Sequence, residues 1–293
     1  MCDYKRETRY GAKPYRGITP DGKTVARRMP SAAGCARIPG KALPSWPFYQ
    51  ETIMKTARLA LFAALVAATL PGRAAPPAGG AIGIVEINQD KAVAGNVTPG
   101  DTGGFPVTIS QRGSYRLTSN LTVPAGSSGV PNGIHITADD VTLDLNGFAI
   151  VSDGCSGTPL SCNGWGAGIV AQDIRTGVTV MNGTVRGMPA GAVFLGSGRI
   201  ERMQIIGNLQ GITMKRGVVS NNVVLGNQGL GIWLVETGSV IGNTALDNGS
   251  LGIFFGGQGG WAHNVLAGNN SGGVQVQGGT ALGGNFCSYS GCP

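Results

Sequence analysis

The sequence predicts an all-β solenoid, in which short parallel strands stack coil upon coil. Two observations carry this prediction. A unit of glycine followed by an apolar, a variable and another apolar residue recurs along the chain, and asparagines recur at fixed places between these units. Self-similarity at a fixed period of about 20 residues is the sequence signature of a repeat architecture.

The glycine units set the expected strands. From Gly191 onward successive unit glycines lie 20, 20, 21 and 21 residues apart, and the whole series is Gly133, Gly168, Gly191, Gly211, Gly231, Gly252 and Gly273. The first position after each glycine is apolar, and so is the third in the last five units, from Phe194 to Val276. This period of two is typical of a strand with one buried face. The series places Ala192 and Val274 at first, inward positions.

Two series of asparagines follow the same period. One stands twelve residues after the last three glycines, with Asn222 one step off, and comprises Asn222, Asn243, Asn264 and Asn285. The other precedes the glycines by three or four residues and comprises Asn208, Asn227, Asn248 and Asn269. Asparagine tolerates the backbone of a tight bend, and stacked amides hydrogen-bond along a column. We therefore expect two asparagine columns at the bends.

Basic residues concentrate at the start of the chain. Residues 1–53 hold ten Lys or Arg against four Asp or Glu, whereas the chain from Ala75 onward holds nine against eleven. The repeats therefore lack the basic footprint of a nucleic-acid-binding protein. Residues 1–53 are interpreted either as upstream sequence translated in error or as a disordered basic extension.

Residues 54–75 have the layout of a secretory signal peptide. Lys55 and Arg58 precede an apolar run from Leu59 to Leu70, and small residues follow near Ala75. The run has 12 residues, fewer than the about 20 that span a membrane. We predict a secreted or periplasmic protein, exported by a signal that starts at Met54, with no membrane span in the mature chain.

Four cysteines in the exported part form two close pairs, Cys155/Cys162 and Cys287/Cys292. Neither pair has the spacing or the nearby histidine of a zinc site, so no metal site is predicted there. In an oxidising compartment we expect two local disulfides. They would pin a loop inserted before Gly168 and the C-terminal cap.

Residues 76–112 are predicted to cap the N-terminal end of the solenoid, because an open apolar end must be covered. The stretch "EINQDKAVAG" predicts a short helix with Ile87, Ala92 and Val93 facing that end.

The stretches "VTLDLNGFAI", "NGTVRGM" and "GIWLVETGSVIGNTALDNGSLGI" resemble the repeats of the pectate-lyase-like (pectin lyase fold) superfamily. The resemblance covers residues 113–293. It implies a single-stranded, right-handed parallel β-helix of about seven to eight coils. It also implies action on acidic polysaccharides, by a lyase with calcium-binding acidic residues and an Arg or Lys base, or by a hydrolase.

The catalytic motifs that this resemblance leads one to seek are missing. Of the hydrolase motifs only Asp-Asp is present, at Asp139-Asp140, and a turn before a strand is the favoured role for it. His135 is expected to point outward beside Asp173, most simply as a surface histidine. The missing motifs leave enzymatic activity undecided. A calcium ion is expected only for a lyase.

The second position after each glycine is expected to point outward, in a column of Val193, Thr213, Trp233, Phe254 and Gln275. Trp233 and Phe254 are large apolar side chains on neighbouring coils, where polar ones are expected. Lys215, Arg216 and Glu236 flank them. Aromatic faces beside hydrogen-bonding charges suit a sugar ring. The alternative is that a loop or the N-terminal segment covers the two rings.

The resulting hypothesis is an exported protein that binds, and in the stronger version processes, a polyuronide-like polysaccharide or cell-surface glycan. Trp233 and Phe254 would be stacking platforms, with Lys215, Arg216 and Glu236 as polar contacts. In a lyase, Arg216 or Lys215 would be the base, and Glu236 with Asp173 would bind the cation. The competing hypothesis is a non-catalytic cell-surface or adhesive scaffold. The sequence predicts no oligomeric state.

Overall fold

The computed structural model describes residues 83–126, 129–171, 175–288 and 292, and two short strands nearer the N-terminus. Those two strands, β1 (Gly17–Ile18) and β2 (Thr24–Val25), pair antiparallel within a unit of residues 1–70. The predicted signal peptide and the rest of residues 1–53 lie outside the described residues. The second unit, residues 71–293, contains everything discussed below.

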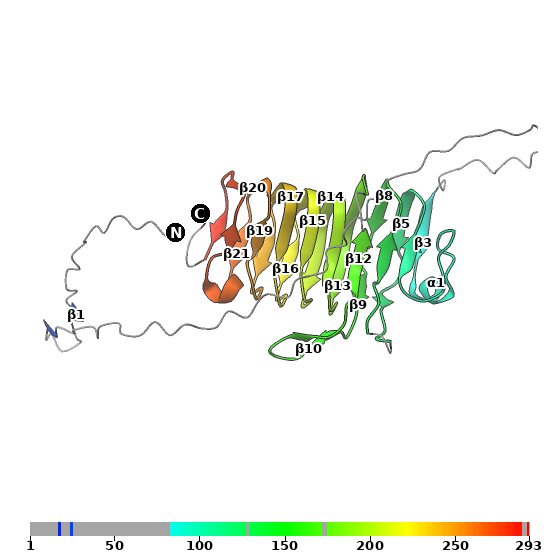
Figure 1. Ribbon diagram of the computed structural model, residues 1–293, viewed down its shortest axis with the longest axis horizontal. Coiled ribbons are helices and arrows are strands. Elements are labelled where there is room, and N and C mark those ends of the chain that lie inside the picture. Colours follow the sequence, from blue (N-terminus) through cyan, green and yellow to red (C-terminus); the bar gives the residue numbers. More distant parts are fainter. Residues whose placement is uncertain are drawn as a thin grey trace, which may run out of the picture. The chain divides into compact units, whose positions relative to one another are not determined.

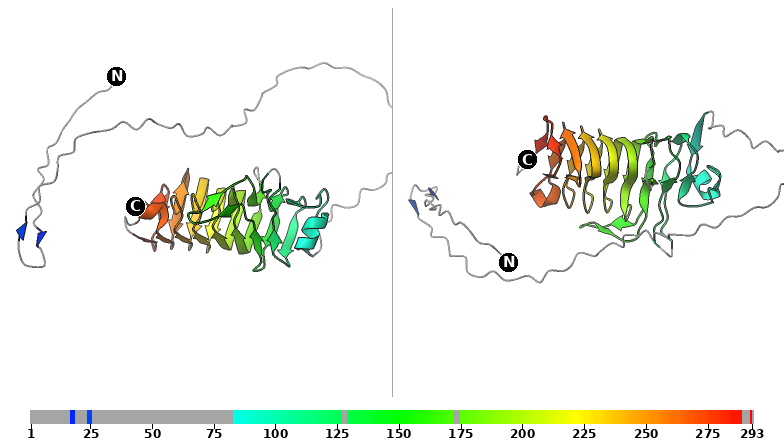
Figure 2. Two further views of the ribbon diagram at one scale, coloured as in Figure 1. Left: turned by 90° about the horizontal axis from the view of Figure 1, so that it is seen from below. Right: turned by 45° about the horizontal axis from the view of Figure 1, so that its top comes forward.

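The second unit is a parallel β-solenoid of about six turns, close to the number expected, and only 5% of the structure is helical. Figure 1 shows its strands stacked in a row, with the helix α1 at one end and the hairpin of β10 projecting from the side. The two further views in Figure 2 show the same positions for the helix and the hairpin. The predicted fold class is therefore confirmed.

The strand pairings divide the solenoid into three faces, A, B and C, which the longest strand β14 (Gly191–Ile206) crosses in order. Face A holds β4 (Val107–Ile109), β7 (Ile134–Ile136), β12 (Ala167–Ala171), the starts of β14, β15 (Ile212–Ser220) and β17 (Ile232–Ile241), β19 (Ile253–Phe255) and β22 (Val276–Gln277).

Face B follows face A along each coil. It holds β3 (Ile84–Ile87), β5 (Gly113–Leu117), β8 (Val141–Asp144), the start of β13 (Val178–Arg186), the middle of β14, the ends of β15 and β17, β20 (Gln258–Ala262) and β23 (Thr280–Ala281). Face C holds β6 (Leu121–Thr122), β9 (Ala149–Val151), the ends of β13 and β14, β16 (Val223–Leu225), β18 (Thr244–Leu246), β21 (Val265–Ala267) and β24 (Phe286–Cys287).

Aligned apolar columns fill the interior. On face A one column is completely buried and runs Ile134, Ile169, Val193, Ile212, Ile232, Ile253 and Val276. The predicted inward residues Ile134, Ile169, Ile212, Ile232 and Ile253 are confirmed. Val193 and Val276, however, occupy the places predicted for Ala192 and Val274. Ala192 is buried, as predicted, but lies outside this column, whereas Val274 is 51% exposed. The glycine spacing therefore gave the wrong register in the units of Gly191 and Gly273.

The register shifts for local reasons. In the unit of Gly191 the residue that pairs with Ile212 is Val193, two positions after the glycine, rather than Ala192, one position after it. At the other end the 3-10 turn η1 (Asn269–Gly272) delays β22, and Gln275 folds inward. Its Oε1 accepts hydrogen bonds from the backbone N and Nδ2 of Asn269, at 3.2 and 2.8 Å. Gln275 thereby closes an asparagine column.

Both predicted asparagine columns are confirmed. Seven of the eight asparagines are at most 1% exposed, and Asn285 at the end is partly exposed. In each column the Oδ1 atom accepts from the backbone N and the Nδ2 of the asparagine one coil earlier, as between Asn222 and Asn243 at 3.0 and 2.9 Å. The Nδ2 also donates to a backbone carbonyl of the preceding coil, as from Asn243 to Val219 at 2.9 Å. Each buried amide therefore has its partners.

The cap helix α1 (Gln89–Ala94) forms where the sequence predicts it. The Oδ1 atom of Asn88 caps it by accepting from the backbone N of Lys91 at 2.9 Å. Ile87 and Ala92 are fully buried, as expected, but Val93 is 61% exposed, and that prediction is wrong. Neighbouring helical residues point about 100° apart, so Ala92 and Val93 cannot both face the solenoid.

Both predicted disulfides are present. Cys155–Cys162 joins β10 (Cys155–Ser156) to β11 (Ser161–Cys162) in an antiparallel hairpin inserted between β9 and β12. The Cys155 Sγ lies 3.2 Å from the Met188 carbonyl oxygen, so the base of the hairpin packs against the solenoid. Cys287–Cys292 closes a loop at the last coil.

Tyr115 should make the stability of the solenoid fall at alkaline pH. Burial raises the pKa of its phenol, whose hydroxyl donates to the Gln111 carbonyl at 2.7 Å. The folded chain thus holds this proton more tightly than the unfolded chain. The stabilisation that this phenol gives the folded state is complete below the ordinary pKa of tyrosine. It is lost as the pH rises through the pKa of Tyr115 in the folded chain.

We expect Tyr115→Phe to lower the free energy of unfolding by about 1 kcal/mol at pH 8. Denaturation from pH 8 to 12 should show the wild type losing more stability than the variant; parallel curves would contradict this.

Candidate functional site

The outward column of face A carries the aromatic residues. The pairings align Thr108, His135, Val170, Phe194, Thr213, Trp233, Phe254 and Gln277 across the face. Thr213, Trp233 and Phe254 lie where the sequence predicts them. Val193 and Gln275 do not, because both are fully buried. Phe194 takes the outward place beside Thr213 and was missed, since the spacing counted it as an inward residue.

Trp233 and Phe254 form the aromatic part of this column. Both side chains are partly exposed, and their ring centroids lie 6.0 Å apart with a tilt of 34°. The Trp233 Nε1 atom is buried without a hydrogen-bond partner among the described residues. A Cβ atom at Gly256 would lie 3.4 Å from that nitrogen, so the indole edge lies close to the next coil at this glycine. The described residues therefore leave part of both rings open.

A shallow groove of about 350 Å³ lies beside Trp233. It crosses four successive coils, from β12 to β17, and its lining includes Ala171, Phe194, Gly196, Thr213, Lys215 and Trp233. Phe194 and Trp233 supply aromatic carbon, Thr213 a hydroxyl and Lys215 an ammonium. Phe254 does not line the groove; it contacts Trp233 from the next coil.

The three predicted polar contacts differ in how free they are. Arg216 Nε donates to Glu236 Oε2 in an exposed ion pair. Their charges are therefore largely satisfied by each other. Lys215 is exposed, lines the groove and has no hydrogen-bond or ion-pair partner among the described residues. Of the three, Lys215 is the charge available to a ligand.

Neither His135 nor the Asp139-Asp140 pair lines this groove. His135 lies on face A in the outward column, partly exposed and in register with Val170. Asp173 lies outside the described residues. Asp139 Oδ1 accepts from the Thr176 backbone N at 2.8 Å, and Asp140 adopts a φ of 54°. The predicted turn role of the Asp-Asp pair is thus confirmed.

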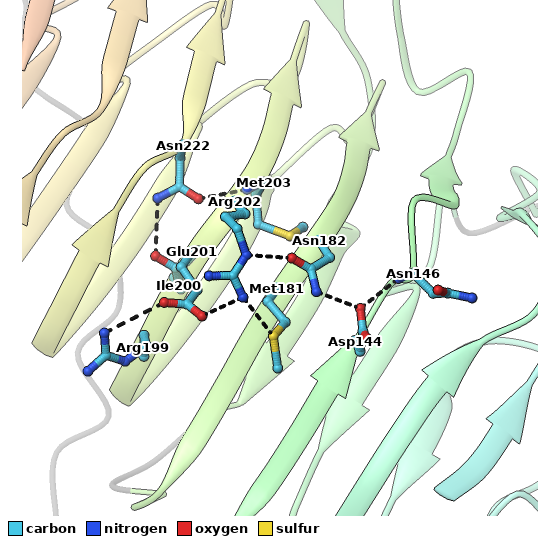
Figure 3. A network of polar contacts seen from close by, with 10 residues as sticks. All are labelled: Asp144, Asn146, Met181, Asn182, Arg199, Ile200, Glu201, Arg202, Met203 and Asn222. Carbon is cyan, nitrogen blue, oxygen red and sulfur yellow. Dashed lines mark hydrogen bonds and ion pairs between the residues drawn. The ribbon is translucent and has the colours of Figure 1, made fainter.

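A second polar cluster lies on face B and its corner with face C (Figure 3), and sequence reasoning missed it. Asp144 on β8 accepts from Asn182 Nδ2 at 3.0 Å, and Asn182 Oδ1 accepts from Arg202 Nε at 2.7 Å. Arg202 also pairs with Glu201 at 2.8 Å, and Arg199 lies 3.6 Å from the same carboxylate. The chain of contacts links β8, β13 and β14.

This cluster is arranged to join coils. Asp144, Met181 and Glu201 are in register, so the two carboxylates stand two coils apart, or about 10 Å at 4.8 Å per coil. Each carboxylate is already bonded to arginine or asparagine side chains, which leaves neither as a free acid or base. The two "Asn-Gly" pairs at 146–147 and 182–183 do not align these coils, because Met181 pairs with Asp144 and the motifs are therefore one residue out of register. The inserted hairpin between them hides the period.

Metal ligands do not cluster in the part of the chain that the structure describes, since no group of three or more His, Cys, Asp or Glu side chains lies together there. Within the same residues, no helix combines the length and the apolar character needed to cross a membrane.

Comparison with known proteins leaves the chain without an identified relative. No protein-family model, no curated protein and no solved structure matches it.

Proposed function

We propose that this protein binds an extended, acidic polysaccharide along face A, with Trp233 and Phe194 as the aromatic contacts and Lys215 as the cation. The observation that carries the proposal is the groove itself, where aromatic side chains stand beside an exposed ammonium that has no partner within the described residues. Sugar rings are apolar on their C–H faces and polar at their rims, and they fit such a surface.

The direction of the groove also supports a polymer as ligand. It crosses the coils from β12 to β17, three steps of about 4.8 Å each, or roughly 14 Å in all. Successive coils then offer different side chains along one line, so that a chain of sugar units meets a row of contacts. Lys215 favours a carboxylate or sulfate on one of these units. Phe254 would support Trp233 rather than stack on sugar itself.

The proposal includes export. The structure contains two disulfides, and disulfides persist in oxidising compartments. The signal-like residues 54–75 and the resemblance to pectate-lyase-like repeats point the same way. A lyase activity would rest on Lys215 as base, because Arg216 is held by Glu236. The cation site predicted at Glu236 and Asp173 remains part of that hypothesis.

A non-catalytic adhesive scaffold is the second candidate. The observation that favours it is that Asp144 accepts from Asn182 and Glu201 pairs with Arg202, which leaves no free acid and base in the polar cluster of Figure 3. In that case polysaccharide binding would occur without cleavage.

Both candidates are tested together. The mature chain is incubated with a panel of polyuronides, sulfated glycans and neutral glycans, with and without calcium. Binding is measured on a glycan array, and cleavage by the absorbance of unsaturated products and by reducing ends. We expect binding to acidic members. Binding without products selects the scaffold, products select the enzyme, and no binding to any acidic glycan contradicts the proposal.

The two neighbouring cations should differ in their effect on binding. Lys215→Met should weaken binding of an acidic glycan about tenfold, because the lost ionic contact contributes about 1.4 kcal/mol, which corresponds to that factor. The affinity for neutral glycans should stay unchanged. Arg216→Met is the matched control, because Glu236 already neutralises it. An equal loss for both variants in isothermal titration would show that Lys215 has no special role.

A further inference from the structure

Face C carries an apolar surface that neither the groove nor the polar cluster uses. Its strands β16, β18 and β21 are three residues long, with the central residue buried and the outer two pointing out. The pairings align two outward columns: Gln204, Val223, Thr244, Val265 and Phe286, and beside it Arg186, Ile206, Leu225, Leu246 and Ala267. Between β14 and β24, the described part of both columns holds no charged side chain.

Several of these side chains are more exposed than apolar residues on a sheet usually are. Val223 is 40% exposed, Val265 41% and Phe286 58%, while Ile206, Leu225 and Leu246 are partly exposed. We call these six residues the apolar strip. A contiguous exposed apolar surface on a soluble protein marks an interaction site.

We infer that the apolar strip is where a second copy of this chain docks, face C against face C, to form a two-fold dimer. An identical copy presents the same spacing between coils, so the side chains of the two sheets meet row against row over their whole length. The solenoid that carries the strip is also nearly neutral, with nine basic and eleven acidic residues after residue 74, so two copies repel each other little.

The charges at the edge of the strip fit this arrangement. Arg186, Ile206, Leu225 and Leu246 are successive members of one column, and Asp247 directly follows Leu246. Arg186 and Asp247 therefore lie on the same edge of face C, three coils apart. Both are exposed, and neither has an ion-pair partner among the described residues. A two-fold axis along the strands, midway between Ile206 and Leu225, sets Arg186 of each copy opposite Asp247 of the other.

The same axis matches the apolar rows. The row of Ile206 then faces the row of Leu225, and charged groups meet only at the edge. Face C is made of eight strand segments about 4.8 Å apart and about 10 Å long, which gives roughly 700–800 Å² of sheet for two copies. Stable specific interfaces bury about 1,200–2,000 Å², so we expect a reversible, concentration-dependent dimer. This inference is independent of the proposed function, since face A stays free.

Sedimentation equilibrium of the full chain, from micromolar to millimolar concentration, tests the inference. We expect a monomer–dimer equilibrium. Val223→Thr combined with Val265→Thr keeps the shape and β-branching of both side chains and should weaken the dimer at least tenfold. Val218→Thr, on the outward side of face B, is the matched control and should leave the equilibrium unchanged.

The charge arrangement has its own test. Arg186→Glu places a carboxylate opposite Asp247 and should weaken the dimer at least tenfold. Adding Asp247→Asn removes that repulsion and should restore association to the level of Asp247→Asn alone; asparagine suits the φ of 52° at this position. Circular dichroism checks that each variant folds. The inference is overturned if the chain stays monomeric, or if none of the face C variants weakens the dimer. If Arg186→Glu alone leaves the dimer intact, the two-fold arrangement is wrong.

Discussion

Replacing Asn243 by Ala is expected to destabilise the solenoid by about 3–5 kcal/mol, a large share of the stability of an ordinary domain. Its Oδ1 accepts from the backbone N and Nδ2 of Asn222 at 3.0 and 2.9 Å, and its Nδ2 donates to Val219 at 2.9 Å. The substitution leaves the backbone N–H of Asn222 and one of its two Nδ2 hydrogens without an acceptor, while the other hydrogen keeps the Ile200 carbonyl. The Val219 carbonyl loses the donated hydrogen bond, and each such loss costs about 1–3 kcal/mol. Denaturant unfolding followed by circular dichroism measures the loss.

The control is an asparagine outside the columns. Asn163 is exposed, and its side chain makes no hydrogen bond within the described residues. Asn163→Ala should therefore change the free energy of unfolding by less than about 0.5 kcal/mol. If Asn243→Ala were as mild as this control, the stacked amides would not be a major source of stability.

The asparagine columns were predictable because their spacing reflects a local requirement that every coil must meet. An amide at a bend must find its partner one coil away, so its position in each repeat is fixed by geometry. The interior of face A was predictable for the same reason, since Ile212, Ile232 and Ile253 repeat at equal intervals. Where successive repeats are equally spaced, counting residues assigns the correct strand register.

The register was not predictable where a coil changes length. A count from Gly191 makes Phe194 an inward residue, but its ring turns back over that glycine, where an added Cβ would lie 2.6 Å from Cζ. A count from Gly273 makes Gln275 an outward residue, but its amide ends the column after Asn269. Both differences come from side chains that satisfy local contacts, which a spacing rule does not contain.

The candidate groove was only partly predictable. Trp233 and Lys215 were identified because large apolar and charged residues at outward positions stand out in a period of two. The strand pairings add Phe194, and the ion pair removes Arg216 from the free charges. The polar cluster of Asp144, Asn182 and Arg202 joins coils whose spacing is interrupted by the hairpin, so no simple count aligns them.

The largest effect on binding is expected from Trp233→Ala. The indole forms the wall of the groove and contacts Phe254, so its removal takes away the main apolar contact for a sugar ring. A buried aromatic anchor contributes about 2 kcal/mol or more, which corresponds to a loss of at least about 30-fold in affinity. The acidic glycan that binds best in the panel is titrated by calorimetry against both proteins.

Trp165 provides the matched control for this experiment. It is 78% exposed, follows the disulfide hairpin and does not line the groove, so Trp165→Ala should leave affinity unchanged. Because Trp233 points outward while its neighbours Ile232 and Leu234 fill the interior, Trp233→Ala should unfold at nearly the wild-type denaturant concentration. A folded Trp233→Ala variant that binds the glycan as tightly as the wild type would show that face A is not the binding surface, whereas a selective loss ties recognition to the open face of the indole.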